Sequence, residues 1–319
     1  MEKALNPGKA VSRLGRGYLI CLVGTVLWSS TAVFIRYLTE TYHMPALLLA
    51  FWRDLIVFLT LATVFALFNP SRLRVGRENL RFLFFYGLVL SLFNALWTVS
   101  VALNGAAIST VLAYSSAAFT AILGWRIFKE QLGATKILAV VASIAGCALV
   151  SGALDRAAWQ INPAGIVVGL ISGLAFAAYS LMGKASSNRS IYPWSTLLYS
   201  FGFAAVFLLV YNLLPGNLLG DKATPDLLWL GRALGGWAML AILAVGPTIG
   251  GYGLYTVSMT YLPASVANLI ATLEPAMTAG LAYLLLNERM SVVQLVGSGL
   301  IISGVIILRM SEGRTAEVL

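Results

Sequence analysis

Residues 45–68 read PALLLAFWRDLIVFLTLATVFALF, an almost unbroken apolar run. At a rise of 1.5 Å per residue, a helix of this length can cross the roughly 30 Å hydrocarbon core of a bilayer. Similar runs recur along the whole chain, of which 59% is hydrophobic and 10% charged. A soluble domain usually carries about 25% charged residues. We therefore expect an all-α integral membrane protein with lipid as one of its solvents. The short alternating strands of a membrane barrel are not seen.

Ten such runs can be placed, which predicts ten transmembrane helices. Turn-forming pairs such as Asn69-Pro70, Asn104-Gly105 and Asn162-Pro163 stand between them. The first run follows basic residues but is too long for a signal peptide and lacks a cleavage motif, so we interpret it as a retained helix. The predicted spans are 17–38, 45–68, 81–103, 105–128, 133–153, 163–185, 192–214, 236–258, 262–286 and 291–309.

Lys and Arg are distributed unevenly between the two sides of these spans. With the N-terminus in the cytoplasm, fifteen of the 21 basic residues fall on the cytoplasmic side, five on the other, and Arg53 inside a span. This bias predicts a plasma-membrane protein with cytoplasmic ends at 1–16 and 311–319. The net charge of +9 does not indicate nucleic acid, because the basic residues occupy separate loops. Cys21 and Cys147 lie in apolar runs and indicate no disulfide framework.

The second half of the chain repeats the first. A shift of 158 residues aligns 97–151 with 255–309 without a gap, and a shift of 148 aligns the first two spans with the sixth and seventh. Each copy has five spans, an odd number, so the second copy must cross the membrane in the opposite sense. We therefore predict inverted five-helix repeats at 17–153 and 163–310 around a central cavity. This architecture recurs in secondary transporters.

Short motifs in both copies resemble the EamA family of the drug/metabolite transporter superfamily. Leu286-Asn287-Glu288-Arg289-Met290 resembles the end of an EamA repeat, and Phe128-Lys129-Glu130-Gln131-Leu132 is its weaker first copy. Trp28-Ser29-Ser30 and Phe51-Trp52-Arg53 also resemble EamA positions. The resemblance covers about 17–310 and implies ten helices, a central cavity, and export or exchange of small organic metabolites.

One position departs from the family pattern. The family often has proline in the middle of span four, where this chain has Ala117, whereas the second copy has Pro275. A helix break is therefore not expected in the first copy.

Glu274 is the acidic residue nearest the centre of span nine, and Pro275 follows it. Proline cannot donate to the carbonyl of Ala271, so we expect a kink and a free acceptor beside the carboxylate. Both features suit an ammonium group, another cation or a proton, and Glu274 is our candidate for proton coupling. The alternative is a structural role, as a partner of Arg53 or as a buried neutral acid.

Arg53 and Asp54 are neighbours in span two and are not expected to face the same way. Arg53 either lines the cavity and binds a substrate carboxylate, or forms a structural ion pair that orients its helix. The sequence leaves both alternatives open.

Further candidates for substrate binding are aromatic, amide and hydroxyl side chains. The repeat register superposes Asn94 and Trp97 on Tyr252 and Tyr255, which could give two symmetric faces that stack on a cationic or aromatic solute. Helix packing or hydroxyl bonding within one helix is the alternative for each. The set is Trp28, Asn94, Trp97, Tyr114, Ser116, Tyr179, Tyr252 and Tyr255.

Glycine and proline mark candidate hinges at Gly246, Pro247, Gly250, Gly251 and Pro275. The glycines could instead serve close packing. Small residues four apart in spans five and ten, such as Ala142 and Gly146, indicate helix packing within a monomer or across a homodimer. Glu130 and Glu288 lie at helix ends and are expected to be solvated.

A secondary transporter of small amphipathic metabolites is the function that these features favour. The predicted substrates are amino acids or related amines, moved by alternating access and in the direction of export; quaternary or lipophilic amines or drugs are the alternative. An enzyme is disfavoured, because there is one histidine, His43, no cluster typical of a metal or cofactor site, and no nucleotide-binding motif. A non-transporting scaffold would not need a central acid. The expected partners are a small molecule and the lipid bilayer.

Overall fold

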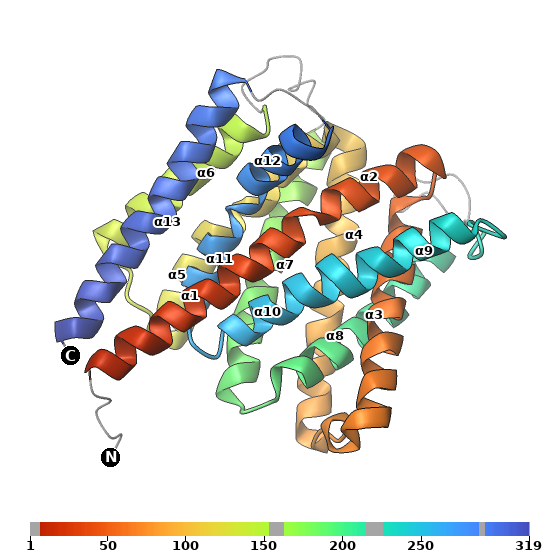
Figure 1. Ribbon diagram of the computed structural model, residues 1–319, viewed down its shortest axis with the longest axis horizontal. Helices are drawn as coiled ribbons and strands as arrows, with labels where there is room; N and C mark the ends of the chain where they lie inside the picture. Colours follow the sequence, from red (N-terminus) through yellow and green to blue (C-terminus); the bar gives the residue numbers. More distant parts are fainter. Residues whose placement is uncertain (1–6, 153–162, 215–225, 287–290, 319) are drawn as a thin grey trace.

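The computed structural model describes residues 7–152, 163–214, 226–286 and 291–318, and within these ranges it is helical with no strand. Figure 1 shows the helices as one bundle with both termini at the same end. The helices are α1 (Pro7–Ser29), α2 (Thr31–Thr41), α3 (Ala46–Phe68), α4 (Arg77–Tyr114), α5 (Ser116–Phe128), α6 (Ala134–Val150), α7 (Pro163–Asn188), α8 (Pro193–Leu213), α9 (Leu234–Leu243), α10 (Gly250–Ser258), α11 (Ala264–Ala271), α12 (Glu274–Leu286) and α13 (Val292–Val318). A 3₁₀ turn (Pro70–Leu73) follows α3, and a π-helical turn (Ala244–Ile249) joins α9 to α10.

The predicted all-α membrane fold is confirmed. Seven stretches of the described chain are long and apolar enough to cross a membrane. Two shorter apolar helices, Ala134–Val150 and Val292–Leu308, and the interrupted pair α11–α12 bring the crossings in the described ranges to ten.

The turn predicted at Asn104-Gly105 falls inside α4, which is assigned as a single helix over Arg77–Tyr114. The chain nevertheless reverses there. Residues nine apart in a straight helix are about 13.5 Å apart along its axis, yet the Ser100 hydroxyl donates to the Ser109 hydroxyl at 2.8 Å. The third and fourth crossings therefore meet in a bend between Ser100 and Ser109, and helical hydrogen bonding continues up to it from both sides.

The two repeats pack mainly against each other. α1 lies on α10, α4 on α7, α3 on α8, and α6 on α13. When each helix is replaced by its counterpart in the other repeat, the α1–α10 contact becomes the α7–α4 contact. The α3–α8 and α6–α13 contacts are each replaced by themselves, as inverted repeats require. The core therefore lies at the junction of the two halves.

Glycines allow the closest of these helix crossings. A Cβ at Gly251 would lie 2.9 Å from the Cβ of Trp28, and a Cβ at Gly24 would lie 3.2 Å from the carbonyl oxygen of Gly251. A Cβ at Gly146 would lie 2.6 Å from the carbonyl oxygen of Gly297, where α6 meets α13. The small residues of spans five and ten thus bring two helices of the same chain together.

Within the described ranges four crossings are interrupted, and near each break a side-chain hydroxyl donates to a backbone carbonyl. Ser30 separates α1 from α2, and Ser115 separates α4 from α5; each hydroxyl donates to the carbonyl three residues earlier, which competes with the helical bond. Span four is thus interrupted without a proline. Pro247 cannot donate to the Leu243 carbonyl, and the Thr248 hydroxyl donates to it instead, at 2.8 Å.

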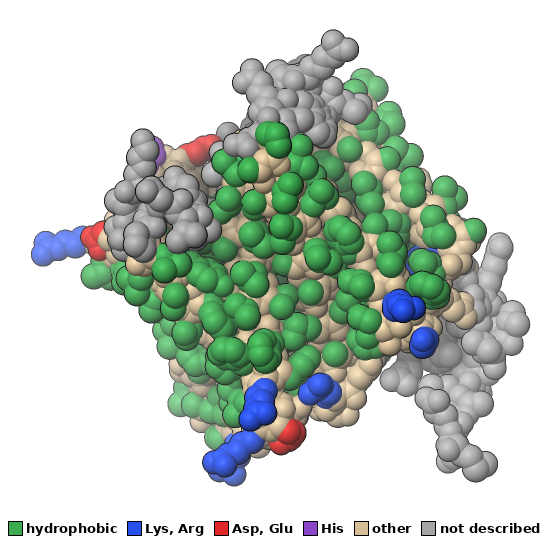
Figure 2. All heavy atoms as spheres, turned by 180° about the vertical axis from the view of Figure 1, so that it is seen from behind, with side chains coloured by type: hydrophobic (Ala, Val, Ile, Leu, Met, Phe, Trp, Pro, Cys, Tyr) green, Lys and Arg blue, Asp and Glu red, His purple; other side chains and the backbone are tan. Residues whose placement is uncertain are grey.

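Apolar side chains cover the middle of the face seen in Figure 2, and Lys and Arg lie toward its edges. Leu59, Val206 and Val210 are among the large apolar residues that are about half exposed. Such a surface suits lipid, because contiguous apolar area of this extent is not typical of a protein in water.

Candidate substrate site

Glu274 lies at the interruption of the ninth crossing. α11 ends at Ala271, and α12 begins at Glu274 itself. The positive end of the α12 dipole favours a negative charge at this position. The break therefore places a carboxylate in the middle of the membrane segment, where the helix end offsets part of the cost of burying it.

The Tyr114 hydroxyl donates to the Glu274 carboxylate. Tyr114 ends α4, next to the interruption at Ser115, so the two residues join the interrupted crossings of the first and second repeats. They are 160 positions apart in the sequence. Arg53 was the partner considered for Glu274 in the alternative, structural role; the hydrogen-bond partner of this carboxylate in the structure is Tyr114.

A chain of hydrogen bonds runs beside this pair and crosses both repeats. The Ser116 hydroxyl donates to the Asn268 side-chain oxygen at 3.1 Å, and the Asn268 amide donates to Ser180 at 2.9 Å. The hydroxyls of Ser180 and Tyr255 are 2.7 Å apart. Sequence reasoning missed Asn268 and Ser180. Their polarity inside apolar runs was the signal that could have found them, because such side chains need a partner in a membrane.

Arg53 forms an ion pair with its sequence neighbour Asp54, contrary to the expectation that the two face apart. Arg53 Nε donates to Asp54 Oδ1 at 2.9 Å, and the Asn94 amide lies 3.4 Å from Asp54 Oδ2. Both residues are buried, so each charge offsets the burial of the other.

An aromatic cluster fills the junction between the repeats. The Trp28 ring lies 4.3 Å from that of Tyr252 and 5.8 Å from that of Tyr255, and Tyr179 contacts Tyr252 at 5.8 Å. Trp28 also meets Phe176 edge-on at 5.7 Å, and Phe176 is its counterpart at a shift of 148.

The two superposed pairs do not form matching faces. Tyr252 and Tyr255 both contact Trp28, whereas Asn94 is directed to Asp54. Trp97 is half-buried and makes no ring contact within the described part of the chain. The residues that the repeat alignment superposes therefore do not form a symmetric pocket in the structure.

The candidate hinges have different surroundings. Gly246 and Pro247 belong to the π-helical turn, and Pro275 follows the break between α11 and α12. Gly250 and Gly251 are packing positions, since an added Cβ would meet Leu27 at 2.8 Å and Trp28 at 2.9 Å respectively.

The side chain of Glu130 is only 7% exposed rather than solvated. Its carboxylate accepts the backbone N–H of Ala264 at 2.9 Å and the Ser265 hydroxyl, and it lies 3.9 Å from Lys136 Nζ. It thereby satisfies donors at the start of α11. The expectation was wrong for Glu130, because a residue at the end of one helix can cap another helix that is distant in sequence. Glu288 lies outside the described residues.

Interrupted helices around a central acid, held between two inverted repeats, are the architecture of many integral membrane transporters. The EamA-like transporter family matches residues 15–152 and 163–310, and the chain belongs to this family. It is a membrane transporter of that family.

The relatives of the chain are also transporters. It is 25% identical to the uncharacterized transporter YwfM of Bacillus subtilis, over 94% of this chain and 96% of that protein. It is 27% identical to a probable amino-acid metabolite efflux pump of Salmonella typhimurium, over 91% and 93%. It is 25% identical to the threonine/homoserine exporter RhtA of Escherichia coli, over 75% and 74%. One crystal structure superposes with a TM-score of 0.75, over 94% of this chain and 99% of that one, at 15% identity, which shows the shared fold.

Proposed function

We propose that this transporter exports small amphipathic metabolites that carry an amine, such as amino acids or related compounds, across the plasma membrane by alternating access. The observation that carries the proposal is Glu274 at a helix break in the middle of its crossing, bonded to Tyr114 of the other repeat. An acid at such a position is suited to an ammonium group or a proton. Two relatives with names that refer to amino acids or their metabolites support this substrate class.

The aromatic cluster supports the same class. Trp28, Tyr252 and Tyr255 lie together near the junction of the repeats, and their ring faces attract cations. In this proposal the substrate's ammonium group displaces the Tyr114 hydroxyl from Glu274, and the rings contact its apolar part. Both termini lie in the cytoplasm, in keeping with the bias of Lys and Arg along the sequence.

One observation favours lipophilic or quaternary amines as a second substrate class. Arg53 is already paired with Asp54, so it is less available to a substrate carboxylate than an unpaired arginine would be. A substrate without a carboxylate would leave this pair intact.

The test is transport into everted membrane vesicles with an imposed pH gradient and a panel of radiolabelled amino acids and amines. Glu274→Gln removes the charge and keeps the shape, so gradient-driven accumulation should fall to background while the protein stays folded. Glu78→Gln is the matched control, because Glu78 is exposed at the start of α4 and should tolerate the change. Unchanged gradient coupling in Glu274→Gln would remove this residue from the mechanism, and no accumulation by the wild type from any panel compound would contradict the substrate class.

A further inference from the structure

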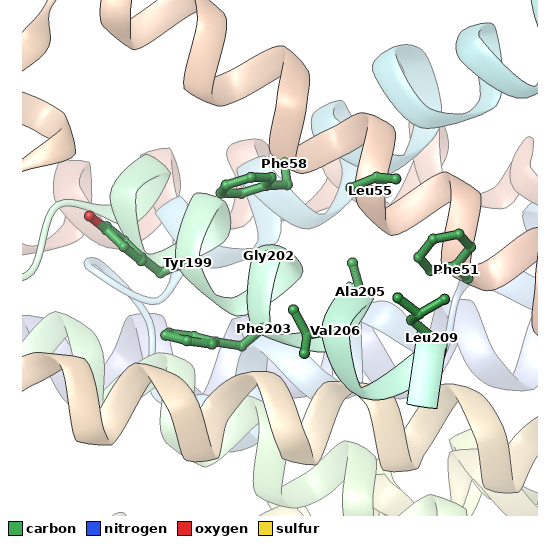
Figure 3. Close-up of a pocket in the computed structure, with 9 residues that line it drawn as sticks. All are labelled: Phe51, Leu55, Phe58, Tyr199, Gly202, Phe203, Ala205, Val206 and Leu209. Atoms are coloured by element: carbon green, nitrogen blue, oxygen red, sulfur yellow. The ribbon is translucent and has the colours of Figure 1, made fainter. Parts of the chain in front are cut away.

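A groove of about 380 Å³ runs between α3 and α8 (Figure 3), and its lining includes none of the residues of the candidate substrate site. Phe51, Leu55 and Phe58 of α3 form one wall, and Val206 and Leu209 belong to the α8 wall. The one polar side chain of the lining, Tyr199, donates its hydroxyl to the Leu73 carbonyl at 2.6 Å. The groove thus offers carbon surface and no unpaired polar group, so it does not suit a polar metabolite.

The groove is open to the membrane. Val206 on its α8 wall is 58% exposed, and Leu59, beside the wall residue Phe58, is 50% exposed. Gly202 of α8 faces the α3 wall, because an added Cβ at this position would lie 2.7 Å from the Phe58 ring. The absence of a side chain at this position leaves room for α3 and α8 to approach at the floor while the groove above stays open.

The length of the groove matches one leaflet of a bilayer. Tyr199 and Leu209 on its α8 wall are ten residues apart, which is about 15 Å of helix. That is half of the roughly 30 Å hydrocarbon core. One extended acyl chain of a single leaflet therefore fits its length.

Basic residues lie at the Tyr199 end. The Pro70–Leu73 turn contacts the start of α8 through Tyr199 and through Ser195, whose hydroxyl donates to the Arg72 carbonyl at 2.8 Å. The Arg72 guanidinium lies 3.7 Å from the centre of the Tyr192 ring. Arg74 and Arg77 follow and are exposed, with Glu78 as the acidic neighbour.

The connection of α3 to α4 lies at the bottom of Figure 1, and Lys and Arg gather at the lower edge of the apolar face in Figure 2. A cationic rim at the end of a leaflet-long apolar groove is complementary to an anionic lipid. We propose that the α3–α8 groove binds one anionic phospholipid, with an acyl chain between Phe58 and Val206 and its phosphate at Arg74 and Arg77.

The probe is phosphatidylglycerol, compared with phosphatidylcholine of the same acyl chains. Each is titrated into the purified full-length protein in neutral detergent and its bound fraction is measured by native mass spectrometry. Two exposed arginines should make phosphatidylglycerol bind roughly tenfold more tightly or better at low ionic strength. The double substitution Arg74→Gln/Arg77→Gln should abolish this preference, and Arg232→Gln, an exposed arginine at the other end of the molecule, should not.

A second pair of variants tests the groove itself. Val206→Trp should fill it and weaken both lipids several-fold, whereas Val210→Trp, one turn further along α8 and outside the lining, should leave both unchanged. Both positions are about half exposed, so both variants are expected to fold, and a monodisperse elution profile checks this. Equal affinity for the two lipids in the wild type, or unchanged phosphatidylglycerol binding in Val206→Trp, would overturn the proposal. Displacement of the lipid by an amine substrate would likewise assign the groove to transport instead.

Discussion

Among the single side chains, Arg53 shows how much a partner can change an interpretation. Taken alone, a buried arginine suggests a substrate carboxylate. Paired with Asp54 at 2.9 Å, it belongs to a neutral unit, and Asn94 extends that unit to α4. Removing one partner from such a unit leaves an uncompensated buried charge, whereas removing both charges does not.

This asymmetry gives a prediction. Arg53→Gln should destabilise the purified protein strongly, by about 3–5 kcal/mol, because Asp54 is left charged and buried. Arg53→Gln combined with Asp54→Asn should recover most of the loss. Melting temperatures of the single and double variants in detergent measure both effects.

A substrate-binding role for Arg53 would show itself in the same double variant. If the pair is structural, the double variant should still be stabilised more against heat by an amino acid than by the corresponding decarboxylated amine, in the same order as the wild type. Loss of that ranking in a well-folded double variant would assign Arg53 to the substrate carboxylate after all.

Among the helices, the crossing of α1 and α10 depends on glycine. An added Cβ at Gly251 would approach the Cβ of Trp28 to 2.9 Å, in a place where both backbones are already close. Neither helix can withdraw without disturbing the aromatic cluster, because Trp28 and Tyr252 contact each other across the crossing.

Gly251→Ala should therefore destabilise the protein by about 1–3 kcal/mol through overpacking. Gly299→Ala is the matched control, since nothing lies within 4 Å of an added Cβ there and alanine suits the middle of α13 better than glycine. The melting temperature should fall for the first variant and stay equal or rise for the second. A similar rise for both would mean that the α1–α10 contact is looser than the structure has it.

The whole molecule places both termini at one end, as an even number of crossings requires. The bias of Lys and Arg assigns this end to the cytoplasm in our proposal. The two ends carry convenient exposed positions: Ser71 in the turn after α3, and Asp226 in the connection before α9.

Single cysteines at these two positions test the orientation. Cys21 and Cys147 are buried and are replaced first. With an impermeant maleimide, Asp226→Cys should be labelled in intact cells, and Ser71→Cys only after permeabilisation. The reverse pattern would invert the predicted topology.

Much of the architecture could be predicted from residues 1–319 without coordinates. A transmembrane helix satisfies its own backbone within one segment, so its length and hydrophobicity can be read locally. The interruption beside Pro275 follows from proline chemistry in the same local way. The interruptions at Ser30 and Ser115 were not predicted, because a serine that bonds to its own helix breaks it only where the surrounding packing permits.

The ten crossings and the two copies of five could thus be predicted from local sequence patterns, since a crossing through lipid requires a minimum run of apolar side chains. The partners of the polar side chains could not be predicted in this way. Tyr114 meets Glu274 across 160 residues, Asn268 meets Ser116 across 152, and Glu130 caps a helix that begins 134 residues later. Such pairs depend on how far each helix is rotated about its axis and where it bends. Both are settled by contacts between the two halves, and those contacts exist only once the chain has folded.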